Sequence, residues 1–490
     1  MTTVRHAILF SFLESYSGLA LNIVAFTLLA RLLTPEQIGV YSVALAIVTV
    51  MQVLRDFGLV NFVIQKKDLN AEYMATVWGI SLMLGASLFC VVQAAAPLIG
   101  SFYHNEAIRD IARVVALNFL LLPFNSVSLA LLKREMQFKS VMHINVIAGF
   151  SGTLSTLLLA WLGWGALSLA IGSVVNSAAV ALCLLLVGAH KQLGKPALSK
   201  AREVIAFGGQ LTAANIITSV SMDINDIAVG KILGFHEVAI ISRGQGLMNL
   251  FHRDFMNAVR NVAYPAFAQA HRDGEAVEAK YISAVTCVTA VAWPFYGFVS
   301  LFPLDIIRLM FGTQWDQAAP LVPYFCMAGA FSASISLIQT MMLALGHPKL
   351  VSLAEFIMQP IKALTLTEVI FWYRELTPFA IAFLIVAILS VPYFYYFKQK
   401  RAPTDFPALA RKMGGNLLLA VVCLAPPAAL AAWLRGPGAP LGAPMLIACA
   451  TLSLALWLAA LAASRHPLYL EAIDLLRRRR PAPAAAEQAV

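Results

Sequence analysis

Residues 215–260 read NIITSVSMDINDIAVGKILGFHEVAIISRGQGLMNLFHRDFMNAVR. This stretch predicts two apolar helices joined by a short turn, with charged side chains on both helices. The charged residues that matter most here are Asp223, Asp226, Arg243, Arg253 and Arg260. An ionisable side chain at the centre of a membrane costs about 2.5–3.5 kcal/mol on insertion scales, so several together indicate a water-filled interior. The hairpin therefore predicts one wall of a cavity inside a membrane-embedded helix bundle.

The composition of the whole chain supports a polytopic membrane protein. Of its 490 residues, 60% are hydrophobic and 12% are charged, whereas soluble domains carry about 25% charged residues. The net charge is +10, but the basic residues lie in short loops rather than in one patch, so we expect no nucleic-acid partner. The six cysteines lack the spacing of metal sites or disulfide frameworks, and we interpret them as small apolar residues.

Runs of about 20 apolar residues, the length that crosses the hydrocarbon layer, predict transmembrane helices. We expect fourteen of them. The predicted spans are residues 8–30, 37–60, 76–99, 111–132, 141–162, 165–188, 206–232, 238–264, 281–304, 318–345, 350–372, 376–397, 413–434 and 443–464. Lys and Arg gather in alternate loops, as at Lys133, Arg134 and Lys139, whereas the opposite loops hold one or two basic residues such as Arg31. Cytoplasmic loops carry this excess, so both termini are predicted to be cytoplasmic.

The sequence contains an internal repeat. A shift of 200 residues aligns 30–42 with 230–242, so that Arg31 meets Lys231 and Ser42 meets Ser242. Six predicted spans separate the two copies, and an even number means that both halves cross the membrane in the same direction. Parallel repeats of this kind build two-lobed transporters whose substrate site lies between the lobes, near the midplane.

The predicted architecture is all-α, with two parallel six-helix lobes around a central cavity and two extra C-terminal helices. The N-lobe covers residues 1–205 and the C-lobe covers residues 206–400. Residues 401–490 contain the last two helices and a basic tail, which includes the arginines of 477–480. The Pro-Ala repeats that follow these arginines predict a disordered cytoplasmic tail.

Several short motifs follow one another from the first to the twelfth predicted span. They are Ala30-Arg31-Leu32-Leu33, Gly39-Val40-Tyr41, Asp56-Phe57-Gly58-Leu59, Leu132-Lys133-Arg134-Glu135-Met136-Gln137-Phe138-Lys139, Tyr264-Pro265-Ala266-Phe267, Phe311-Gly312-Thr313-Gln314-Trp315 and Leu343-Ala344-Leu345-Gly346-His347. The order and spacing of these motifs resemble those of the polysaccharide-transporter family of O-antigen and colanic-acid (Wzx-type) flippases. That family is a branch of the multidrug/oligosaccharidyl-lipid/polysaccharide exporter superfamily. Ile38 stands where an aromatic residue is usual, and His347 where a basic residue is usual.

The resemblance implies a function. A chain of this kind is expected to pass an undecaprenyl-diphosphate-linked oligosaccharide from the cytoplasmic to the outer leaflet of the inner membrane, for surface polysaccharide synthesis. Its expected partners are this lipid-linked oligosaccharide, membrane lipids and a polysaccharide polymerase or chain-length assembly. No cofactor and no metal is expected, apart from H⁺ or Na⁺ as a counter-ion.

Polar residues in the predicted spans are the candidates for the cavity wall. A diphosphate needs cations, and hydroxyl-rich sugars need amide groups. The candidate substrate-binding residues are Arg55, Arg243, Arg253, Arg260, Lys362, Asn118, Asn215 and Gln359. The candidate ion-coupling residues are Glu14, Asp223 and Asp226.

Two of these groups have structural alternatives. Asp226 and Arg243 lie at similar depth on neighbouring helices, so a structural ion pair between them is the competing interpretation. Glu355, Gln359 and Lys362 are spaced i, i+4 and i+7 and share one helix face. A contact between Glu355 and Lys362 would span two turns and would be weak, so we expect Lys362 to face the cavity.

Two other functions were weighed against a flippase. An extruder of organic cations, from the same superfamily, would need an acidic cavity, whereas the deep charges here are mainly basic. A membrane-embedded glycosyltransferase or polymerase would need large outer loops with a carboxylate or metal-binding pair, and the predicted outer loops are short. The sequence has no phosphate-binding P-loop motif either. We therefore expect a transporter that is not an enzyme.

Overall fold

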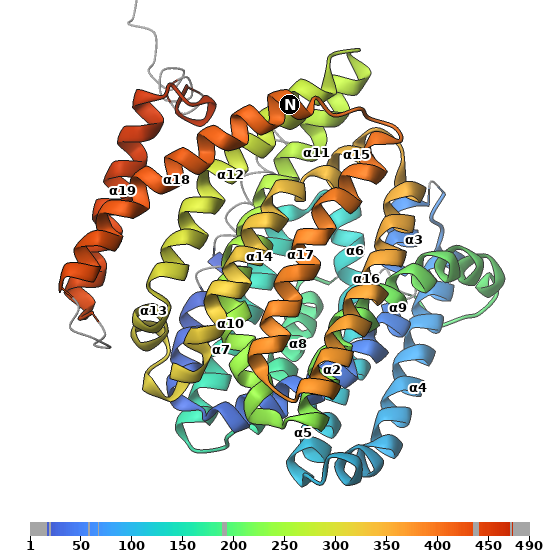
Figure 1. Cartoon of the computed structure of the whole chain (residues 1–490). Helices are drawn as coiled ribbons and strands as arrows, with labels where there is room; N and C mark the ends of the chain where they lie inside the picture. The colour runs from blue at the N-terminus through green and yellow to red at the C-terminus, as the bar shows by residue number, and fades with distance from the viewer. Residues whose placement is uncertain are drawn as a thin grey trace, which may run out of the picture. The chain divides into compact units, whose positions relative to one another are not determined.

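The computed structural model describes the backbone of residues 17–18, 21–56, 59–66, 68–188, 194–434, 441–470 and 473. Within these ranges, the side chains of residues 50, 53–56, 61, 64–65, 207–220, 222 and 254 are not described. Every regular element in this part of the chain is helical. The all-α prediction is confirmed to that extent (Figure 1).

The chain folds into two compact units. Unit 1 comprises Met1–Gly244, Met310–Leu321 and Ser352–Phe383. Unit 2 comprises Gln245–Leu309, Val322–Val351 and Leu384–Val490. Segments of the two units alternate along the sequence, and this division by contacts does not test the predicted lobes. The division into an N-lobe and a C-lobe therefore stays a prediction.

Unit 1 contains most of the first half of the chain. Its helices are the segment Leu21–Leu32, α2 (Pro35–Asp56), α3 (Leu59–Gln65), α4 (Ala71–Tyr103), α5 (Glu106–Ala116), α6 (Asn118–Arg134), α7 (Phe138–Trp161), α8 (Leu167–Val187), α9 (Ala201–Ile232), most of α10 (Phe235–Asn249), the 3₁₀ segment η3 (Thr313–Leu321) and most of α16 (Pro348–Tyr373). Within this unit α7 packs along α8, α2 packs along α9, and α4 packs on α5 and α6.

Unit 2 is built around α12. Its helices are a π-helical turn η2 (Leu250–Phe255), α11 (Met256–Arg272), α12 (Val277–Leu301), α13 (Pro303–Met310), α14 (Val322–Ile335), α15 (Ile338–Ala344), most of α17 (Leu376–Gln399), α18 (Phe406–Leu434) and α19 (Ala443–Ala463). α12 packs on both α14 and α18, and α19 packs on α18.

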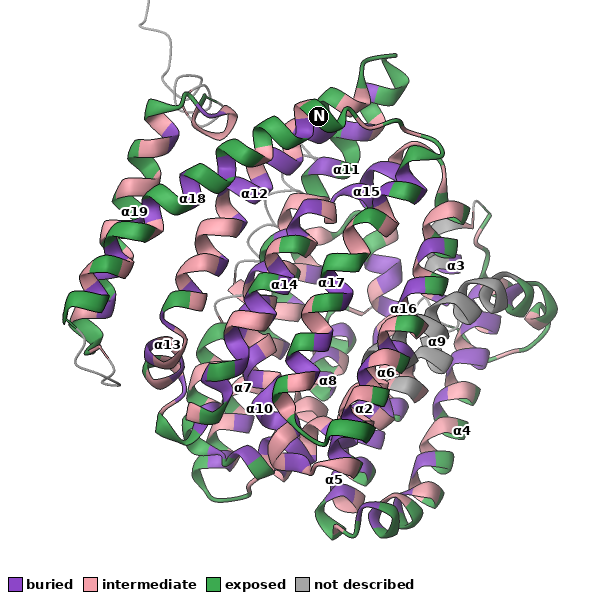
Figure 2. Ribbon diagram, viewed as in Figure 1, coloured by how far each residue is buried: buried purple, intermediate pink, exposed green. Residues whose placement is uncertain are grey.

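The exposed surface of the helices is apolar. Figure 2 shows exposed patches along α19, where Ile447, Leu454 and Leu458 are each more than half exposed. Water would penalise such a surface by about 25 cal/mol per Å², whereas lipid does not. Ten helices among the described residues are long and apolar enough to cross a membrane. The chain is therefore a multi-pass membrane protein.

The fourteen predicted spans are recovered only in part. α2, α9 and the run from α10 to α11 are helical at the expected places, but they are not among the ten apolar helices. Charged residues such as Asp223 and Asp226 lower the mean hydropathy of α9. The first predicted span lies largely outside the described residues, so the count of fourteen stays a prediction.

The ends of α4 illustrate how local sequence sets these helices. Asn70 precedes the helix, and its Oδ1 accepts a hydrogen bond from the backbone N–H of Tyr73 at 3.0 Å, which satisfies one of the free donors of the first turn. His104 ends the helix in the left-handed conformation, with φ of 52°. A span that the sequence predicted as 76–99 is thereby extended to Ala71–Tyr103.

Candidate functional site

Three of the predicted site residues lie outside what the structure describes. Glu14 falls before the described residues. Arg55 is on α2 and Asn215 is on α9, but the side chains of both are not described. Their assignments to ion coupling and to substrate binding stay predictions.

Arg243 is buried in an aromatic cage in unit 1. Its side chain is only 5% exposed, and its guanidinium carbon lies 4.1 Å from the ring centroid of Phe26, 4.8 Å from that of Trp315 and 5.6 Å from that of Phe311. Its Nε has no hydrogen-bond partner among the described residues. The faces of aromatic rings attract a cation, and the attraction grows when water is excluded. Among the described residues, the guanidinium therefore faces aromatic rings and forms no ion pair with a carboxylate.

The structural alternative, an ion pair between Asp226 and Arg243, is not formed. No ion pair joins these two side chains in the described part of the chain, where Arg243 lies against the rings of Phe26 and Trp315. Depth along two helices indicated that the residues lie at one level, but depth says nothing about the direction in which each side chain points. Asp223 and Asp226 remain half-buried on α9, at i and i+3.

The cage is completed by the short segment η3. The indole Nε1 of Trp315 donates to the carbonyl of Ala30 at 2.7 Å, and the amide of Gln314 donates to the carbonyls of Ala30 and Leu33 at 2.5 and 3.2 Å. The last carbonyls of a helix have no partner within the helix. η3 supplies these partners to the helix that ends at Leu32, and so the Phe311–Trp315 motif has a structural role that the sequence did not reveal.

A second cluster lies on α16 and the start of α17. Glu355 and Gln359 contact each other, with Gln359 Nε2 donating to Glu355 Oε2 at 2.8 Å. Lys362 is half-buried near the middle of α16, with its Nζ 4.3 Å from the ring centroid of Phe383. No ion pair of Lys362 is formed within the described residues. The helix face predicted from the i, i+4, i+7 spacing is therefore present. On it, Glu355 accepts a hydrogen bond from Gln359, and Lys362 lies against the ring of Phe383.

Arg253 and Arg260 belong to unit 2. Arg253 is exposed on the π-helical turn η2, and Arg260 donates from Nη2 to Asn257 Oδ1 at 2.8 Å, one turn away on α11. The sequence did not predict the π turn. Such turns often occur at functional sites, and this one is packed by the ring of Phe251, whose centroid lies 4.6 Å from that of Phe255.

Asn118 is part of a packed helix interface. It is buried at the start of α6, and its Nδ2 donates to Ser173 Oγ on α8 at 3.1 Å. Two turns later Asn125 donates to the carbonyl of Ser177 at 2.8 Å. The Oδ1 atoms of both asparagines lack partners among the described residues. Asn118 thus joins α6 to α8 with its amide nitrogen, while its carbonyl oxygen is buried without a described partner.

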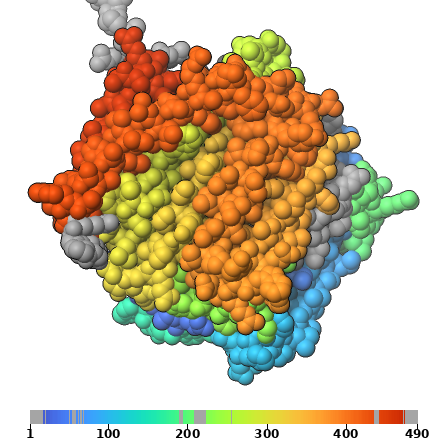
Figure 3. Space-filling model, in the orientation of Figure 1, coloured from blue at the N-terminus to red at the C-terminus, as the bar shows by residue number. Residues whose placement is uncertain are grey.

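Unit 2 also contains an apolar cavity of about 690 Å³ between α12, α14 and α18. Trp293 and Tyr296 line it from α12, Met327 and Phe331 from α14, and Leu424 from α18. Figure 3 shows the face of the molecule on which these helices lie. A cavity of this volume with hardly any polar group fits a hydrocarbon chain better than a sugar or a phosphate.

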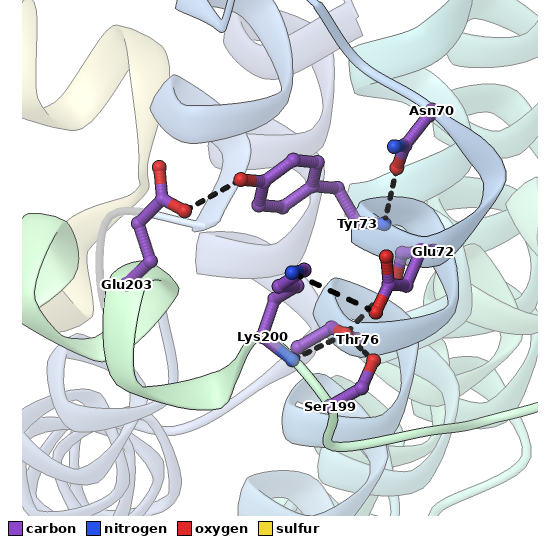
Figure 4. A network of polar contacts seen from close by, with 7 residues as sticks. All are labelled: Asn70, Glu72, Tyr73, Thr76, Ser199, Lys200 and Glu203. Atoms are coloured by element: carbon purple, nitrogen blue, oxygen red, sulfur yellow. Dashed lines mark hydrogen bonds and ion pairs between the residues drawn. The ribbon is translucent and has the colours of Figure 1, made fainter.

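A polar network holds the segment before α9 against the start of α4 (Figure 4). The Tyr73 hydroxyl donates to Glu203 Oε2 at 2.5 Å, and Lys66 forms an ion pair with the other carboxylate oxygen. Thr76 Oγ1 accepts from the backbone N–H of Lys200 at 3.4 Å. Hydrogen bonds from Lys66 and from Tyr73 lower the pKa of Glu203, and the bond to Glu203 raises the pKa of Lys66.

This network gives a structural role to two lysines that lie between helices. Lys66 and Lys200 lie between helices, and their contacts with Glu203 and Glu72 tie the connection between α8 and α9 to the body of unit 1. These contacts link residues more than 120 positions apart. The sequence carried no signal for them.

Comparison with known proteins supports the same family. The family model for "Polysaccharide biosynthesis protein" matches residues 28–320. The lipopolysaccharide biosynthesis protein WzxC of Escherichia coli (strain K12) is 24% identical over 315 residues, which cover 64% of this chain and 64% of that protein. The succinoglycan biosynthesis transport protein ExoT of Rhizobium meliloti (strain 1021) is 24% identical over 328 residues, or 65% of each chain. The matched regions thus span just under two thirds of these relatives.

A solved structure confirms the fold class. The lipid II flippase MurJ in its inward closed conformation superposes with a TM-score of 0.72, over 96% of this chain and 100% of that chain, at 13% sequence identity. At this identity the likeness concerns the fold alone. The family model, in contrast, covers well over half of the sequence. The chain therefore belongs to the polysaccharide biosynthesis protein family.

Proposed function

We propose that this protein is a flippase that moves an undecaprenyl-diphosphate-linked oligosaccharide from the cytoplasmic to the outer leaflet by alternating access. Membership of the family and the ten apolar helices support a membrane role in polysaccharide synthesis. The names of the relatives support transport, since ExoT is a transport protein and MurJ is a lipid flippase. The product would serve the synthesis of a surface polysaccharide.

The observation that carries the proposal is the environment of Lys362. A lysine near the middle of an apolar helix is costly unless it meets a counter-charge or water. Its described interactions are one aromatic ring at close range and a longer-range attraction to Glu355, with no ion pair among the described residues. A diphosphate that enters with the lipid-linked substrate would supply an anion in direct contact. Gln359 and Asn118 of the same unit are proposed for the sugars. Arg253 and Arg260 of unit 2 stay candidates from the sequence.

The apolar cavity of unit 2 is proposed to hold part of the lipid chain. An isoprenoid chain has no polar groups beyond the diphosphate. The lining, which includes Trp293, Phe331 and Leu424, is almost entirely apolar and so matches such a chain. Burial of hydrocarbon against such a surface contributes about 25 cal/mol per Å² relative to water. Inside a membrane the gain over lipid is small, so the cavity would guide the chain rather than trap it.

The membrane potential favours the proposed direction. Moving negative charge outward across an inside-negative membrane gains about 2.3 kcal/mol per charge per 100 mV. The barrier is the removal of water from sugars and phosphates, which polar groups of a cavity would replace. We propose that Glu14, Asp223 and Asp226 carry H⁺ or Na⁺ in return. If the transport rate in vesicles depends on neither an H⁺ gradient nor an Na⁺ gradient, these three residues do not couple transport to an ion.

The proposed location is the inner membrane, with both termini cytoplasmic and a polysaccharide polymerase or chain-length assembly as the next partner. A cysteine placed in the basic C-terminal tail should then react with a membrane-impermeant maleimide only after the inner membrane is opened. Labelling of intact spheroplasts would reverse the proposed orientation.

The function is tested by deletion. A strain that lacks this protein should accumulate the lipid-linked repeat unit on the inner leaflet and lose its surface polysaccharide. Complementation with the intact gene should restore both. Normal polysaccharide in the deletion strain, with no accumulated precursor, would contradict a flippase.

The substrate contact is tested at Lys362. Charge-assisted hydrogen bonds contribute about 1.5–3 kcal/mol, so Lys362→Gln should lower the export rate by roughly 10- to 100-fold. Lys362→Arg keeps the charge and should retain most of the rate. Lys349→Gln is the matched control, because Lys349 is exposed in the first turn of the same helix. Equal export by Lys362→Gln and Lys349→Gln at equal protein levels would remove Lys362 from the site.

A further inference from the structure

Two of the helices that line the apolar cavity of unit 2 contain a proline. Pro294 lies inside α12, and Pro427 lies inside α18. Because proline has no backbone N–H, the carbonyl four residues earlier in a helix loses its usual hydrogen-bond donor. These carbonyls belong to Ala290 and Cys423, which are both 0% exposed. A membrane interior offers no water to replace the missing donor, so each carbonyl needs a partner from the protein.

One helix, α19, supplies a side-chain donor to each of these two carbonyls. The indole Nε1 of Trp457 donates to the carbonyl of Ala290 at 2.8 Å. The hydroxyl of Ser453 donates to the carbonyl of Cys423 at 3.0 Å. Ser453 and Trp457 are four residues apart, so they lie on one face of α19. The same face therefore caps the carbonyls that prolines leave free in two neighbouring helices.

The capping face of α19 is also its packed face. Leu446, Cys449 and Ser453 are buried at intervals of three and four residues, which is the spacing of one helix face. Leu446 and Cys449 belong to an apolar cluster with Phe302, which follows α12, and with Ala431 of α18. The two polar donors are thus set into an apolar contact with the same two helices whose carbonyls they cap.

A second set of hydrogen bonds joins the three helices near the end of α19. Asn416 of α18 donates from Nδ2 to the carbonyl of Thr286 at 2.8 Å and to Thr289 Oγ1 at 2.7 Å, both on α12. His466, just beyond α19, has its Nε2 3.0 Å from Asn416 Oδ1, and its Nδ1 accepts from the backbone N–H of Leu468 at 3.2 Å. Since Nδ1 accepts, Nε2 carries the proton and donates to Asn416. α19 is therefore fastened both along its length and at its end.

We infer that Ser453 and Trp457 are positioning residues for the apolar cavity. They replace the donors that Pro427 and Pro294 remove, and they thereby hold α18 and α12 in the proline-kinked form that surrounds the cavity. The lining runs from residue 293 to 301 on α12 and from residue 417 to 428 on α18, so each proline lies within a lining stretch.

α19 is then a fixed part of the cavity wall. If it left α12 and α18, it would expose both free carbonyls to hydrocarbon. The role of the cavity as a site for the lipid chain rests on the proposed function, whereas the capping of the two carbonyls does not.

The capping is tested by giving the helices their backbone donors back. Ser453→Ala should raise the ratio of unfolded to folded protein at a fixed SDS fraction about 3-fold, the average for a hydrogen bond between membrane helices. In a Pro427→Ala background the same change should have little effect, because the restored N–H satisfies the carbonyl. Trp457→Phe should likewise be relieved by Pro294→Ala. The crossed pairs, Ser453→Ala with Pro294→Ala and Trp457→Phe with Pro427→Ala, should keep the full loss. Equal losses in matched and crossed pairs would overturn the inference.

Two control variants make the same chemical changes where no proline-freed carbonyl is capped. Ser464→Ala removes a hydroxyl at the end of α19 that donates to Ala460 of its own helix. Trp433→Phe changes a side chain that is 82% exposed on α18. Both should have little effect, and a loss from Ser464→Ala as large as that from Ser453→Ala would count against capping. If Ser453→Ala does not fold at all, Pro427→Ala should restore folding, and failure to do so would overturn the inference.

The effect on the cavity needs a second readout, which stability alone does not give. Purified protein is photolysed with a diazirine-bearing farnesyl diphosphate, and the labelled peptides are identified by mass spectrometry. Peptides of α12 and α14 should be labelled in the parent. The variant with both Pro294→Ala and Pro427→Ala should stay folded but be labelled several-fold less, because straight helices no longer surround the cavity. Equal labelling of the folded double variant would show that Ser453 and Trp457 do not shape the cavity.

These outcomes separate the inference from the proposed function. If the parent is not labelled on α12 or α14, the proposed lipid role of the cavity fails, and the matched and crossed pairs still decide whether α19 caps the two carbonyls. If matched replacement brings no relief, the capping fails, and the export defect of the deletion strain is unaffected.

Discussion

Each of the two units buries a cationic side chain, and the groups that surround the charge differ between the units. Lys398 at the end of α17 is 0% exposed, and its Nζ donates to Glu278 Oε2 at 2.5 Å, Thr404 Oγ1 at 2.7 Å and the carbonyl of Ala402 at 3.3 Å. Arg243 in unit 1 is nearly as buried, but its described neighbours are three aromatic rings.

The difference indicates which cation is structural. An ammonium has three donors, and Lys398 uses all three within one compact site. The ammonium is fully hydrogen-bonded there, and in this sense the cation's site is complete, although the buried Oε1 of Glu278 has no partner among the described residues. The site fixes the junction between α12, α17 and the loop that follows. Arg243 keeps a buried Nε without a described partner, and the rings attract its charge without fixing each donor. We therefore call the hydrogen bonding of its site incomplete.

The largest effect should come from breaking the complete site. Lys398→Met leaves Glu278 without its cation, and loss of one partner of a buried pair costs about 3–5 kcal/mol. Because Glu278 is 25% exposed, we expect the lower end, about 3 kcal/mol. The free energy of unfolding is measured by titration with SDS in mixed micelles.

The same site offers two controls for that measurement. Lys400→Met changes an exposed lysine two residues away, whose contacts are the rings of Tyr396 and Phe397, and should have little effect. Lys398→Met combined with Glu278→Gln should be less destabilised than Lys398→Met alone, because no uncompensated charge remains. A double variant that is worse than the single one would refute the pairing.

A much smaller effect is expected at the incomplete site. Arg243→Met fills the cage with an unbranched apolar side chain, loses the attraction of the rings, and removes the cost of burying a charge. These terms oppose each other, so the free energy of unfolding should change by about 1 kcal/mol or less. Arg243→Glu, which sets a carboxylate against ring faces, should destabilise clearly. A loss from Arg243→Met as large as that from Lys398→Met would show that Arg243 has an acidic partner after all.

The comparison also shows where sequence reasoning stops. Apolar runs and alternating basic loops predicted the positions of most helices, because burial in lipid depends on composition along one segment. The surroundings of Arg243 could not be predicted, since Phe26, Phe311 and Trp315 come from distant positions in the chain. The ion pair of Lys398 could not be predicted either, because nothing in the sequence connects it with Glu278, 120 positions earlier.

For the candidate site, the sequence predicted which residues share a face of one helix, but not which residues of different helices meet. The shared face of Glu355, Gln359 and Lys362 follows from helical periodicity, and the structure places the first two in contact. The π turn that presents Arg253 has no proline or other marker within it, so a regular helix was expected there. Asn118 was read as a cavity residue, and its contact with Ser173 depends on how α6 and α8 are rotated.

The smallest effect is expected for a third cation, which extends the comparison to the surface. Lys66 pairs with Glu203 at an exposed site, where ion pairs contribute little because water and salt screen them. Its pH dependence is nevertheless definite. The pKa of Glu203 is lowered from 4.5, chiefly by the hydrogen bond from Lys66, so its contribution is present above pH 4.5 and is lost as the pH falls through the lower folded value. The pKa of Lys66 is raised from 10.5 by Glu203, so its contribution is present below pH 10.5 and is lost as the pH rises through the higher folded value.

The stability difference between the parent and Glu203→Gln should therefore be constant from about pH 5 to pH 10 and should shrink outside that window on both sides. Tyr73→Phe removes one hydrogen bond to the same carboxylate and should give a weaker acid limb of the same sign, with the alkaline limb retained. Glu36→Gln, at an exposed acid in the first turn of α2, provides the charge-matched control. The difference should also fall as NaCl is raised, because exposed charges are screened, whereas the loss caused by Lys398→Met should respond far less to salt. A salt-insensitive difference at Glu203 would mean that this pair is protected from water as Lys398 is, and the contrast between surface and buried cations would fail.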